Sequence, residues 1–308
     1  MDCGFEQLTY ELPDRQLVEE LIEQAGYGAE MLERLHNGGL RRVPVSGSIP
    51  LSRLVNSVAS QFSSEVHEFQ SRTVGVIVAH SIPALAPDDH SFLAECLDGL
   101  GLEQTPRIAV SGQPCAILHS AVQLACAWVR RERQRFGVLV IGADKAYHAS
   151  ERIFFGSAMG DSVFAGFISH RARGHTILSS VTNTEIIATD GELSPPEDIA
   201  AFRAKNPAYI RHAIQLCLQQ ARVGLDTLAY IVPHTPYTMV WDAVSELLTF
   251  PRDRILTDYL PDTGHLNSND SFVHYARAAS EGRIRTGQLA LLVNPAFGGT
   301  RGCTLIRR

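Results

Sequence analysis

The feature that most constrains the fold is a repeated alternation of short apolar runs with amphipathic helical patterns. Continuous runs rich in β-branched residues are typical of strands that are buried on both faces of a sheet. They cover residues 74–79, 107–110, 137–142, 162–168, 229–232, 254–256 and 289–293. Helical patterns lie between them at residues 50–61, 115–136, 208–222 and 272–281. The alternation predicts right-handed βαβ units around largely parallel sheets.

The same order of elements occurs twice along the chain. In each copy a helix leads to a strand, a second strand, a polar corner, a second helix and a third strand. The first copy ends at GVLVIGAD (137–144) and the second at LALLV (289–293). Any α/β protein alternates, so coincidence is one explanation; we favour an internal duplication with a pseudo-twofold axis. The largely polar segment 182–196 is the predicted crossover between the halves.

Composition narrows the class of protein. The 308 residues are 45% hydrophobic and 19% charged, with a net charge of −6, which argues against a nucleic-acid binder. No run approaches the ~18 apolar residues of a membrane span, and the start, MDCGFEQLTYELPD, lacks the pattern of a signal peptide, so we expect a cytoplasmic protein. Six cysteines show neither a CxxC pair nor the spacing of a zinc site, so neither a disulfide framework nor a metal site is predicted.

One cysteine, Cys115, lies where a predicted strand ends and a helix begins, in SGQPCAILHSAV. Unpaired backbone N–H groups and the helix dipole favour an anion there, and therefore a nucleophilic thiolate. Pro114 suits the first turn of the helix. The alternative is an inert buried thiol, which is our interpretation of Cys126 and Cys217 inside helical patterns.

Two histidines follow strands or precede a helix in the second half. His234 comes directly after the strand at 229–232, where α/β proteins place ligand-handling residues, although it could be an ordinary loop histidine. The corner TGHLNSNDS (263–271) contains His265 and Asn267, which no local structure explains. Asn269, Asp270 or Ser271 is expected to cap the following helix with its side chain.

A glycine pair ends the last apolar strand, in NPAFGGT (294–300). Consecutive glycines let the backbone approach a ligand closely, and two N–H groups can form an oxyanion hole. An ordinary hairpin turn into the final strand explains the same residues, and both interpretations can hold.

Together these features resemble the ketoacyl-acyl-carrier-protein synthase III family of thiolase-fold condensing enzymes, over nearly the whole chain. TYELPDRQLVEELIEQ looks like the family's first strand and "LP" turn, and residues 155–165 look like its "FGDGAGAAVL" segment. Cys115 falls at the family's acyl-accepting cysteine, and Pro233-His234 matches its "PH" histidine. Residues 281–292, followed by FGG at 297–299, match "GRIKPGDLVLL…FGGG".

The resemblance implies an α/β thiolase fold, in which duplicated βαβαβ halves form five layers in the order αβαβα. Residues 1–180 would form the half with the nucleophile Cys115. Residues 181–308 would form the half with His234 and the loops at Gly264 and Gly298. Family members are generally dimers, so a homodimer, or a heterodimer with a homologue, is expected.

The resemblance also implies a mechanism that needs no bound cofactor. Cys115 would attack the thioester of an acyl-CoA or acyl-carrier protein, with the oxyanion between the N–H groups of Cys115 and Gly299. The covalent acyl-enzyme predicts ping-pong kinetics, and His234 would assist the second half-reaction as hydrogen-bond donor or base. Arg41, Arg42 and Arg203 are candidates for a CoA or carrier contact by charge alone.

The sequence departs from the family pattern at one informative position. The family has a "GN" pair where this chain has Gly264-His265. That asparagine helps to hold the malonyl thioester during decarboxylation, so we expect acyl transfer to a hydroxyl, amine or carbon acceptor in secondary metabolism. His234, His265 or Asp270 would deprotonate the acceptor, and Asn267 and Asp270 are the candidate supporting residues. The alternatives are decarboxylative condensation and a non-catalytic subunit of a heterodimer.

Overall fold

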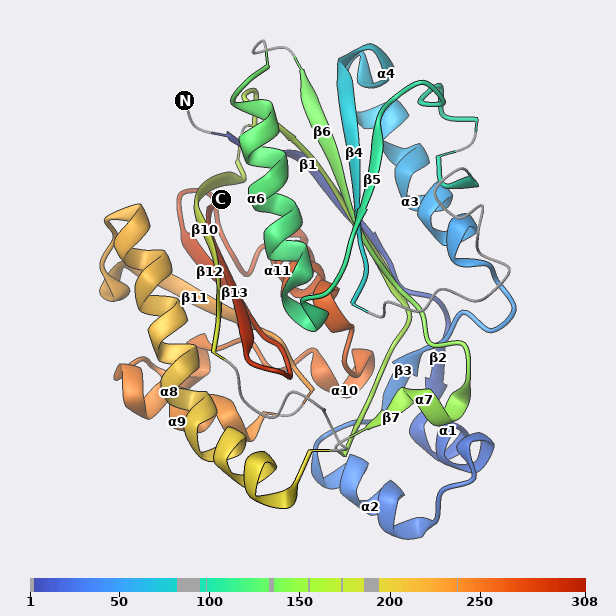
Figure 1. Cartoon of the computed structure of the whole chain (residues 1–308), viewed down its shortest axis with the longest axis vertical. Coiled ribbons are helices and arrows are strands. Elements are labelled where there is room, and N and C mark those ends of the chain that lie inside the picture. The colour runs from blue at the N-terminus through green and yellow to red at the C-terminus, as the bar shows by residue number, and fades with distance from the viewer. Residues whose placement is uncertain are drawn as a thin grey trace.

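A single mixed sheet runs through the molecule (Figure 1). The computed structural model describes residues 3–81, 95–97, 99–132, 136–154, 156–172, 174–185, 194–236 and 238–308. Within these residues, nine strands pair in the order β11-β12-β13-β10-β1-β9-β6-β4-β5. Their bounds are β1 (Cys3–Glu11), β4 (Thr73–Ala79), β5 (Arg107–Val110), β6 (Gly137–Asp144), β9 (Ser162–Ser169), β10 (Thr176–Thr184), β11 (Leu228–Pro233), β12 (Leu289–Pro295) and β13 (Thr300–Arg307).

The strand order repeats the same pattern on either side of the β1–β10 pair. On one side β1–β9 and β9–β6 are antiparallel, whereas β6–β4 and β4–β5 are parallel. On the other side β10–β13 and β13–β12 are antiparallel, and β12–β11 is parallel. Ile255 adds a parallel bridge to Ile231 at the place that corresponds to β5. The strands of the two halves pair with each other through Cys3↔Ile177 and Gly4↔Thr176, so the duplicated halves that the sequence predicts are present.

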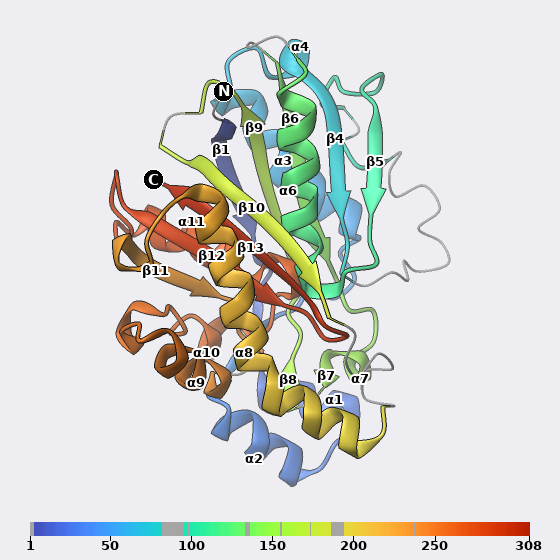
Figure 2. The ribbon, with the colours of Figure 1, turned by 60° about the vertical axis from the view of Figure 1, so that its left-hand side comes forward.

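Three helical layers separate and cover the two halves of the sheet (Figure 2). One buried cluster joins α6 and α11 to strands of both halves, so these two helices form the middle layer. A second cluster packs α3 on the outer face of the first half, and a third packs α8 and α9 on the outer face of the second. The predicted five-layered order αβαβα is therefore confirmed. The helices are α3 (Leu51–Glu65), α6 (Ile117–Val129), α8 (Pro196–Ala221), α9 (Met239–Leu248) and α11 (Asp270–Ser280).

Short elements cap one end of the molecule (Figure 1). A small cluster that includes Leu21, Leu35 and Leu260 holds them together. The carboxylate of Asp161 is fully buried and receives two bonds from Arg152, at 2.7 and 2.9 Å. The capping elements are β2 (Arg15–Leu17), α1 (Val18–Ala25), α2 (Ala29–Asn37), β3 (Arg42–Pro44), α7 (Ala149–Arg152), β7 (Ile153–Phe154), β8 (Ser157–Ala158) and α10 (Leu260–Thr263). The remaining elements are α4 (Phe69–Arg72) and the 3-10 turns η2 (Pro114–Ala116), η4 (Leu225–Thr227), η5 (Arg252–Arg254) and η6 (Asn267–Asn269).

Several predicted elements differ in detail from the observed ones. The predicted strand at 254–256 is wrong, because the chain makes a single bridge there after the turn η5. The helix predicted over 115–136 begins with a 3-10 turn and ends at Val129, and residues 133–135 lie outside the described residues. Helix α8 begins twelve residues earlier than the pattern at 208–222 indicates.

Two sequence predictions fall partly outside the described residues. The predicted crossover at 182–196 includes residues 186–193, and the family-like segment at 155–165 includes residue 155. The predicted division between the halves at 180/181 also stays a prediction. Among the described residues, no helix has the length and apolar character needed to cross a bilayer.

Candidate active site

The nucleophile candidate lies at the start of the middle-layer helix α6. Strand β5 ends at Val110, and the turn Pro114–Ala116 leads directly into α6. Cys115 is partly exposed, whereas the other five cysteines, Cys126 and Cys217 among them, are buried. Cys115 is therefore the thiol that a reagent can reach from solvent.

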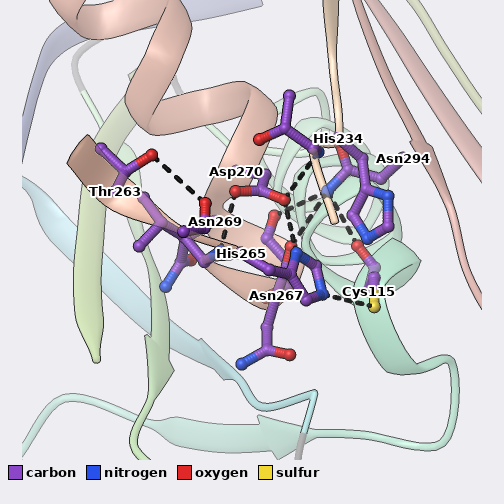
Figure 3. A network of polar contacts seen from close by, with 12 residues as sticks. Cys115, His234, Thr263, His265, Asn267, Asn269, Asp270 and Asn294 are labelled. Atoms are coloured by element: carbon purple, nitrogen blue, oxygen red, sulfur yellow. Dashed lines mark hydrogen bonds and ion pairs between the residues drawn. The ribbon is translucent and has the colours of Figure 1, made fainter. Parts of the chain in front are cut away.

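His265 connects this thiol to a buried carboxylate (Figure 3). Its Nε2 lies 3.5 Å from Sγ of Cys115, and its Nδ1 lies 2.6 Å from Oδ2 of Asp270. Both His265 and Asp270 are completely buried. The three side chains form a thiol–imidazole–carboxylate chain, the arrangement in which a carboxylate orients a histidine that acts on a nucleophile.

The Asp270 carboxylate also fastens the loops around the site. Its Oδ1 accepts a bond from the N–H of Leu266 at 2.8 Å, and its Oδ2 accepts one from Thr235 at 2.9 Å. The same group therefore fixes the His265 loop and the loop that follows His234. Because these bonds hold the Asp270 carboxylate in place, its bond to Nδ1 also orients the His265 ring toward Cys115.

The expected side-chain cap of α11 is absent, so that prediction is wrong. Asn269 is the residue before the helix, and no side-chain cap bond is formed there. The Asn269 amide instead donates to Oγ of Ser162 at 3.0 Å, and the Asp270 carboxylate turns back toward Leu266. Local sequence suggested a cap because both residue types are good caps, but contacts with distant segments use these side chains.

Burial and neighbouring charge have opposite effects on the pKa of His265, and likewise on the pKa of Asp270. Burial alone would lower the pKa of His265, but the charges of Asp270 and Cys115 outweigh it and raise that pKa to about 10. Burial would raise the pKa of Asp270, but the neighbouring His265 holds it well below its usual range. The site therefore favours an imidazolium between a carboxylate and the thiol sulfur.

His234 completes the cluster from the end of β11. Its ring meets that of His265 edge to face, with centroids 4.3 Å apart. Its backbone N–H donates to Val293, and its carbonyl accepts the indole N–H of Trp241 at 3.0 Å. Burial, followed by the charge of His265, lowers its pKa well below the usual value, so this imidazole is neutral. Among the described residues, its buried Nε2 has no hydrogen-bond partner.

Asn294 is a site residue that the sequence analysis did not single out. Its Nδ2 donates to the carbonyl of Cys115 at 2.9 Å and to the carbonyl of Ser268 at 3.1 Å. It thereby joins the nucleophile turn to the turn that follows His265. The available signal was weak, an Asn-Pro pair at the end of a buried strand.

The two remaining predicted site residues, Asn267 and Gly299, make no described side-chain or backbone bond to Cys115, His234 or His265. Asn267 is buried with a positive φ of 54°, and Figure 3 shows its side-chain amide pointing away from the Cys115 sulfur. Gly299 lies in the turn between β12 and β13, with a φ of 100°. Its N–H makes a long bond of 3.3 Å to the carbonyl of Ala296. The hairpin interpretation of this turn is confirmed, while the oxyanion role of Gly299 stays a prediction.

Known proteins with similar sequences all point to one family. Residues 218–308 match the C-terminal model of 3-oxoacyl-[acyl-carrier-protein] synthase III. A β-ketoacyl-[acyl-carrier-protein] synthase III of Wolbachia pipientis subsp. Culex pipiens is 23% identical over 63% of this chain and 64% of that relative. One of Sphingopyxis alaskensis is 24% identical over 94% of this chain and 93% of the relative. The chain thus spans less than two thirds of the length of the Wolbachia relative.

Similar solved structures extend over the entire chain. The acyltransferase ChlB3 has a TM-score of 0.86 at 18% identity and covers 100% of this chain and 98% of its own. The 3-oxoacyl-[acyl-carrier-protein] synthase III of Aquifex aeolicus has a TM-score of 0.81 at 16% identity, covering 99% of this chain and 100% of its own. These similarities confirm the thiolase fold and the resemblance to the synthase III family.

Proposed function

We propose that this chain, a ketoacyl synthase III-like protein of the thiolase fold, is an acyltransferase that carries the acyl group on Cys115. One observation carries the proposal: Cys115, His265 and Asp270 form a continuous chain of contacts of 3.5 and 2.6 Å. The donor is an acyl-CoA or acyl-carrier-protein thioester. The acceptor is a hydroxyl, an amine or a carbon nucleophile, and we place the reaction in secondary metabolism.

In the first half-reaction the Cys115 thiolate attacks the thioester carbonyl. A tetrahedral oxyanion forms, and the N–H groups of Cys115 and Gly299 are the proposed donors to it. For Gly299 this requires that the oxyanion replace the Ala296 carbonyl as acceptor. The carbon–sulfur bond of the donor then breaks, and the leaving thiolate takes the Nε2 proton of His265. The products are acyl-Cys115 and the released thiol.

In the second half-reaction the acceptor attacks the acyl group on Cys115. The now neutral His265 removes the proton of the attacking hydroxyl or amine, and Asp270 stabilises the imidazolium that results. The Cys115 thiolate leaves, and the imidazolium–thiolate pair is restored. His234, which is neutral, contributes a hydrogen bond to the carbonyl or to the incoming acceptor.

Decarboxylative condensation is the second candidate. The observation in its favour is that the curated relatives are synthases, and the tetronic acid condensing enzyme AbyA1 has a similar structure, with a TM-score of 0.79 at 16% identity. Against it stands the His265–Asp270 pair, because an imidazolium bound to a carboxylate and a thiol replaces the neutral amide that the family resemblance implies. Acyl transfer therefore uses the observed groups more directly.

We also propose that the protein is a dimer that pairs through the edge strand β5. Within the part of the chain that the structure describes, β5 is an edge strand that pairs only with β4, and its Ile108 is 40% exposed. Leu124 on helix α6 is 47% exposed, so α6 and the edge strand each present a large apolar side chain to solvent. A partner could be a second copy or a homologue. A purely non-catalytic subunit is less well supported, because such a subunit has no need of the complete Cys115 chain.

The test is the intact-protein mass after incubation with a panel of acyl-CoA and acyl-carrier thioesters. The proposal predicts a mass gain equal to one acyl group, absent in Cys115→Ala, and lost again when an acceptor is added. Release of CO₂ from malonyl thioesters with formation of a ketoacyl product would instead support condensation. No mass gain from any donor in a folded sample would overturn the Cys115 acyl-enzyme.

A further inference from the structure

The three side chains at the site also have the composition and placement of a zinc site. The ligating atoms of Cys115, His234 and His265 all lie within 4.8 Å of one another. They come from the start of α6, the end of β11 and the loop before α11, so no local sequence spacing reveals them. We propose that this cluster binds one Zn²⁺ ion, which holds the thiol in an unreactive form.

The distances suit a tetrahedral zinc ion. Zinc binds thiolate sulfur at about 2.3 Å and imidazole nitrogen at about 2.0–2.1 Å, so a tetrahedral sulfur–nitrogen pair lies about 3.6 Å apart. The Sγ of Cys115 and the Nε2 of His265 are 3.5 Å apart. The third ligating atom, on His234, lies within 4.8 Å of the other two. The ion takes the place of the proton between Sγ and Nε2, and that proton is released.

The outer contacts of the two histidines also suit a metal. His265 is bound through Nδ1 to Asp270, the carboxylate–histidine arrangement that orients zinc ligands and raises their basicity. Among the described residues, the buried Nε2 of His234 has no partner, so a cation would satisfy an otherwise unmet acceptor. The thiolate and Asp270 together supply two negative charges, which balance Zn²⁺.

The donor set selects the kind of metal. One sulfur and two imidazole nitrogens match zinc, whereas magnesium and calcium require oxygen ligands. Three protein ligands leave the fourth position open to a water molecule, as in zinc sites that are not purely structural. Because Cys115 is partly exposed, the ion can enter from solvent.

The inference does not depend on acyl transfer, since it concerns coordination by the unmodified side chains. It has one chemical consequence: zinc draws electron density from the sulfur bound to it and makes that sulfur a weaker nucleophile. Zinc and alkylation of Cys115 therefore compete, and so do zinc and acylation, because an alkylated or acylated sulfur is a poor ligand.

The test is a titration of the untagged full-length protein with Co²⁺, followed by displacement with Zn²⁺. We expect one equivalent of Co²⁺ to give the intense visible bands of a tetrahedral site and a thiolate-to-cobalt band in the near ultraviolet. Cys115→Ala should lose the thiolate band, and His234→Ala should bind at least 100-fold more weakly. Asp270→Asn should bind about 10–100-fold more weakly, the usual cost of losing an outer partner of a metal ligand.

The matched control is Cys217→Ala, which removes a buried thiol outside the cluster and should bind like the wild type. Circular dichroism of each variant checks that it is folded. A second readout is protection: stoichiometric Zn²⁺ should slow alkylation of Cys115 by iodoacetamide at least tenfold in the wild type and not in His234→Ala. Binding without a thiolate band, equal binding by Cys115→Ala, or absence of protection would overturn the inference.

The proposed function and the zinc site fail independently. Metal binding with no acylation from any donor would overturn only the acyltransferase. Acylation of Cys115 in a protein that gives no thiolate–cobalt band would overturn only the zinc site.

Discussion

The two halves of the sheet end in equivalent corners that carry opposite chemistry. In the first half the corner before α6 holds Cys115, partly exposed and reached from solvent. In the second half the corner before α11 holds His265 and Asp270, both completely buried. The same position in the fold holds the proposed nucleophile in one half and, in the other, the groups proposed to act on it.

The difference lies in what holds each corner in place. The Asp270 carboxylate accepts bonds from three groups, while the carbonyl of Cys115 receives one from Asn294. A second buried carboxylate, Asp144, accepts bonds from Ser81 and Ser268 beside the same corner. A buried network of this kind keeps its groups oriented, because each unsatisfied member would cost free energy. In the proposed reaction the buried corner would therefore orient the base, and the partly exposed corner would admit the substrate.

The largest expected effect comes from removing the reactive atom of the open corner. Cys115→Ala should abolish the acyl-enzyme altogether, because no other described thiol is exposed. The mass of the intact protein after incubation with the donor measures this. Cys217→Ala is the matched control and should acylate normally. A mass gain that persists in Cys115→Ala would break the assignment of roles to the two corners.

The next largest effect is expected when the buried carboxylate of Asp270 is replaced by a neutral amide. Asp270→Asn should slow acyl transfer by about 10²–10⁴-fold, because His265 loses the charge that orients it and stabilises its imidazolium. The variant should also lose about 3–5 kcal/mol of unfolding free energy, since it removes one partner of a buried ion pair. Single-turnover kinetics and denaturant unfolding measure the two effects.

The variant Asp161→Asn separates the expected loss of unfolding free energy from the expected loss of acyl-transfer rate. Asp161 is also completely buried and paired with a cation, Arg152, but the described bonds of its carboxylate go to Arg152, Ser46 and Ala146 and not to Cys115. It should lose a comparable unfolding free energy and keep its acyl-transfer rate where it is folded. If it slows transfer as much as Asp270→Asn does, general loosening explains both variants.

A smaller effect is expected at the link between the corners. Asn294→Ala removes the bonds to the carbonyls of Cys115 and Ser268, so the thiol should be less well placed. We expect kcat to fall about tenfold while KM for the donor stays close to the wild-type value. Asn206→Ala, a buried asparagine outside the site, is the control. A change confined to KM would show that Asn294 binds substrate rather than positioning the nucleophile.

The smallest effect on the rate is expected at Trp241, whose indole N–H donates to the carbonyl of His234. Trp241→Phe removes the indole donor to the His234 carbonyl, a bond worth about 1 kcal/mol, so transfer should slow only a few-fold. Steady-state kinetics measures this. A loss as large as that of Asp270→Asn would mean that the position of His234 matters to the reaction as much as that of His265.

Much of the fold is predictable from this sequence because its strands are buried on both faces. Continuous apolar runs such as 74–79 and 137–142 mark β4 and β6. Strand β10 was missed because TILSSVTNT is mostly polar and only part-buried. The first turns of α8 were missed because they are mainly exposed and contain Pro207, which interrupts a helical pattern.

The site is predictable only where its signal is local. Cys115 and His234 follow from their places at element ends, and His265 stood out because the family resemblance implies asparagine there. The sequence indicates Asp270 as one of three cap candidates and as a candidate base, but its contact with His265 depends on how the loop folds back. The bond from Asn294 to Cys115 joins residues 179 positions apart, so no local pattern indicates it.

The most direct test of whether Asp270 and His265 activate Cys115 is the rate at which iodoacetamide alkylates this thiol. The rate is measured in the wild type and in Asp270→Asn, with a metal chelator present. This measurement needs no knowledge of the natural donor, and the other five thiols are buried. If Asp270 holds His265 as an imidazolium beside the sulfur, the variant should react at least tenfold more slowly. Equal rates in two folded proteins would contradict the claim that the buried corner activates the exposed one.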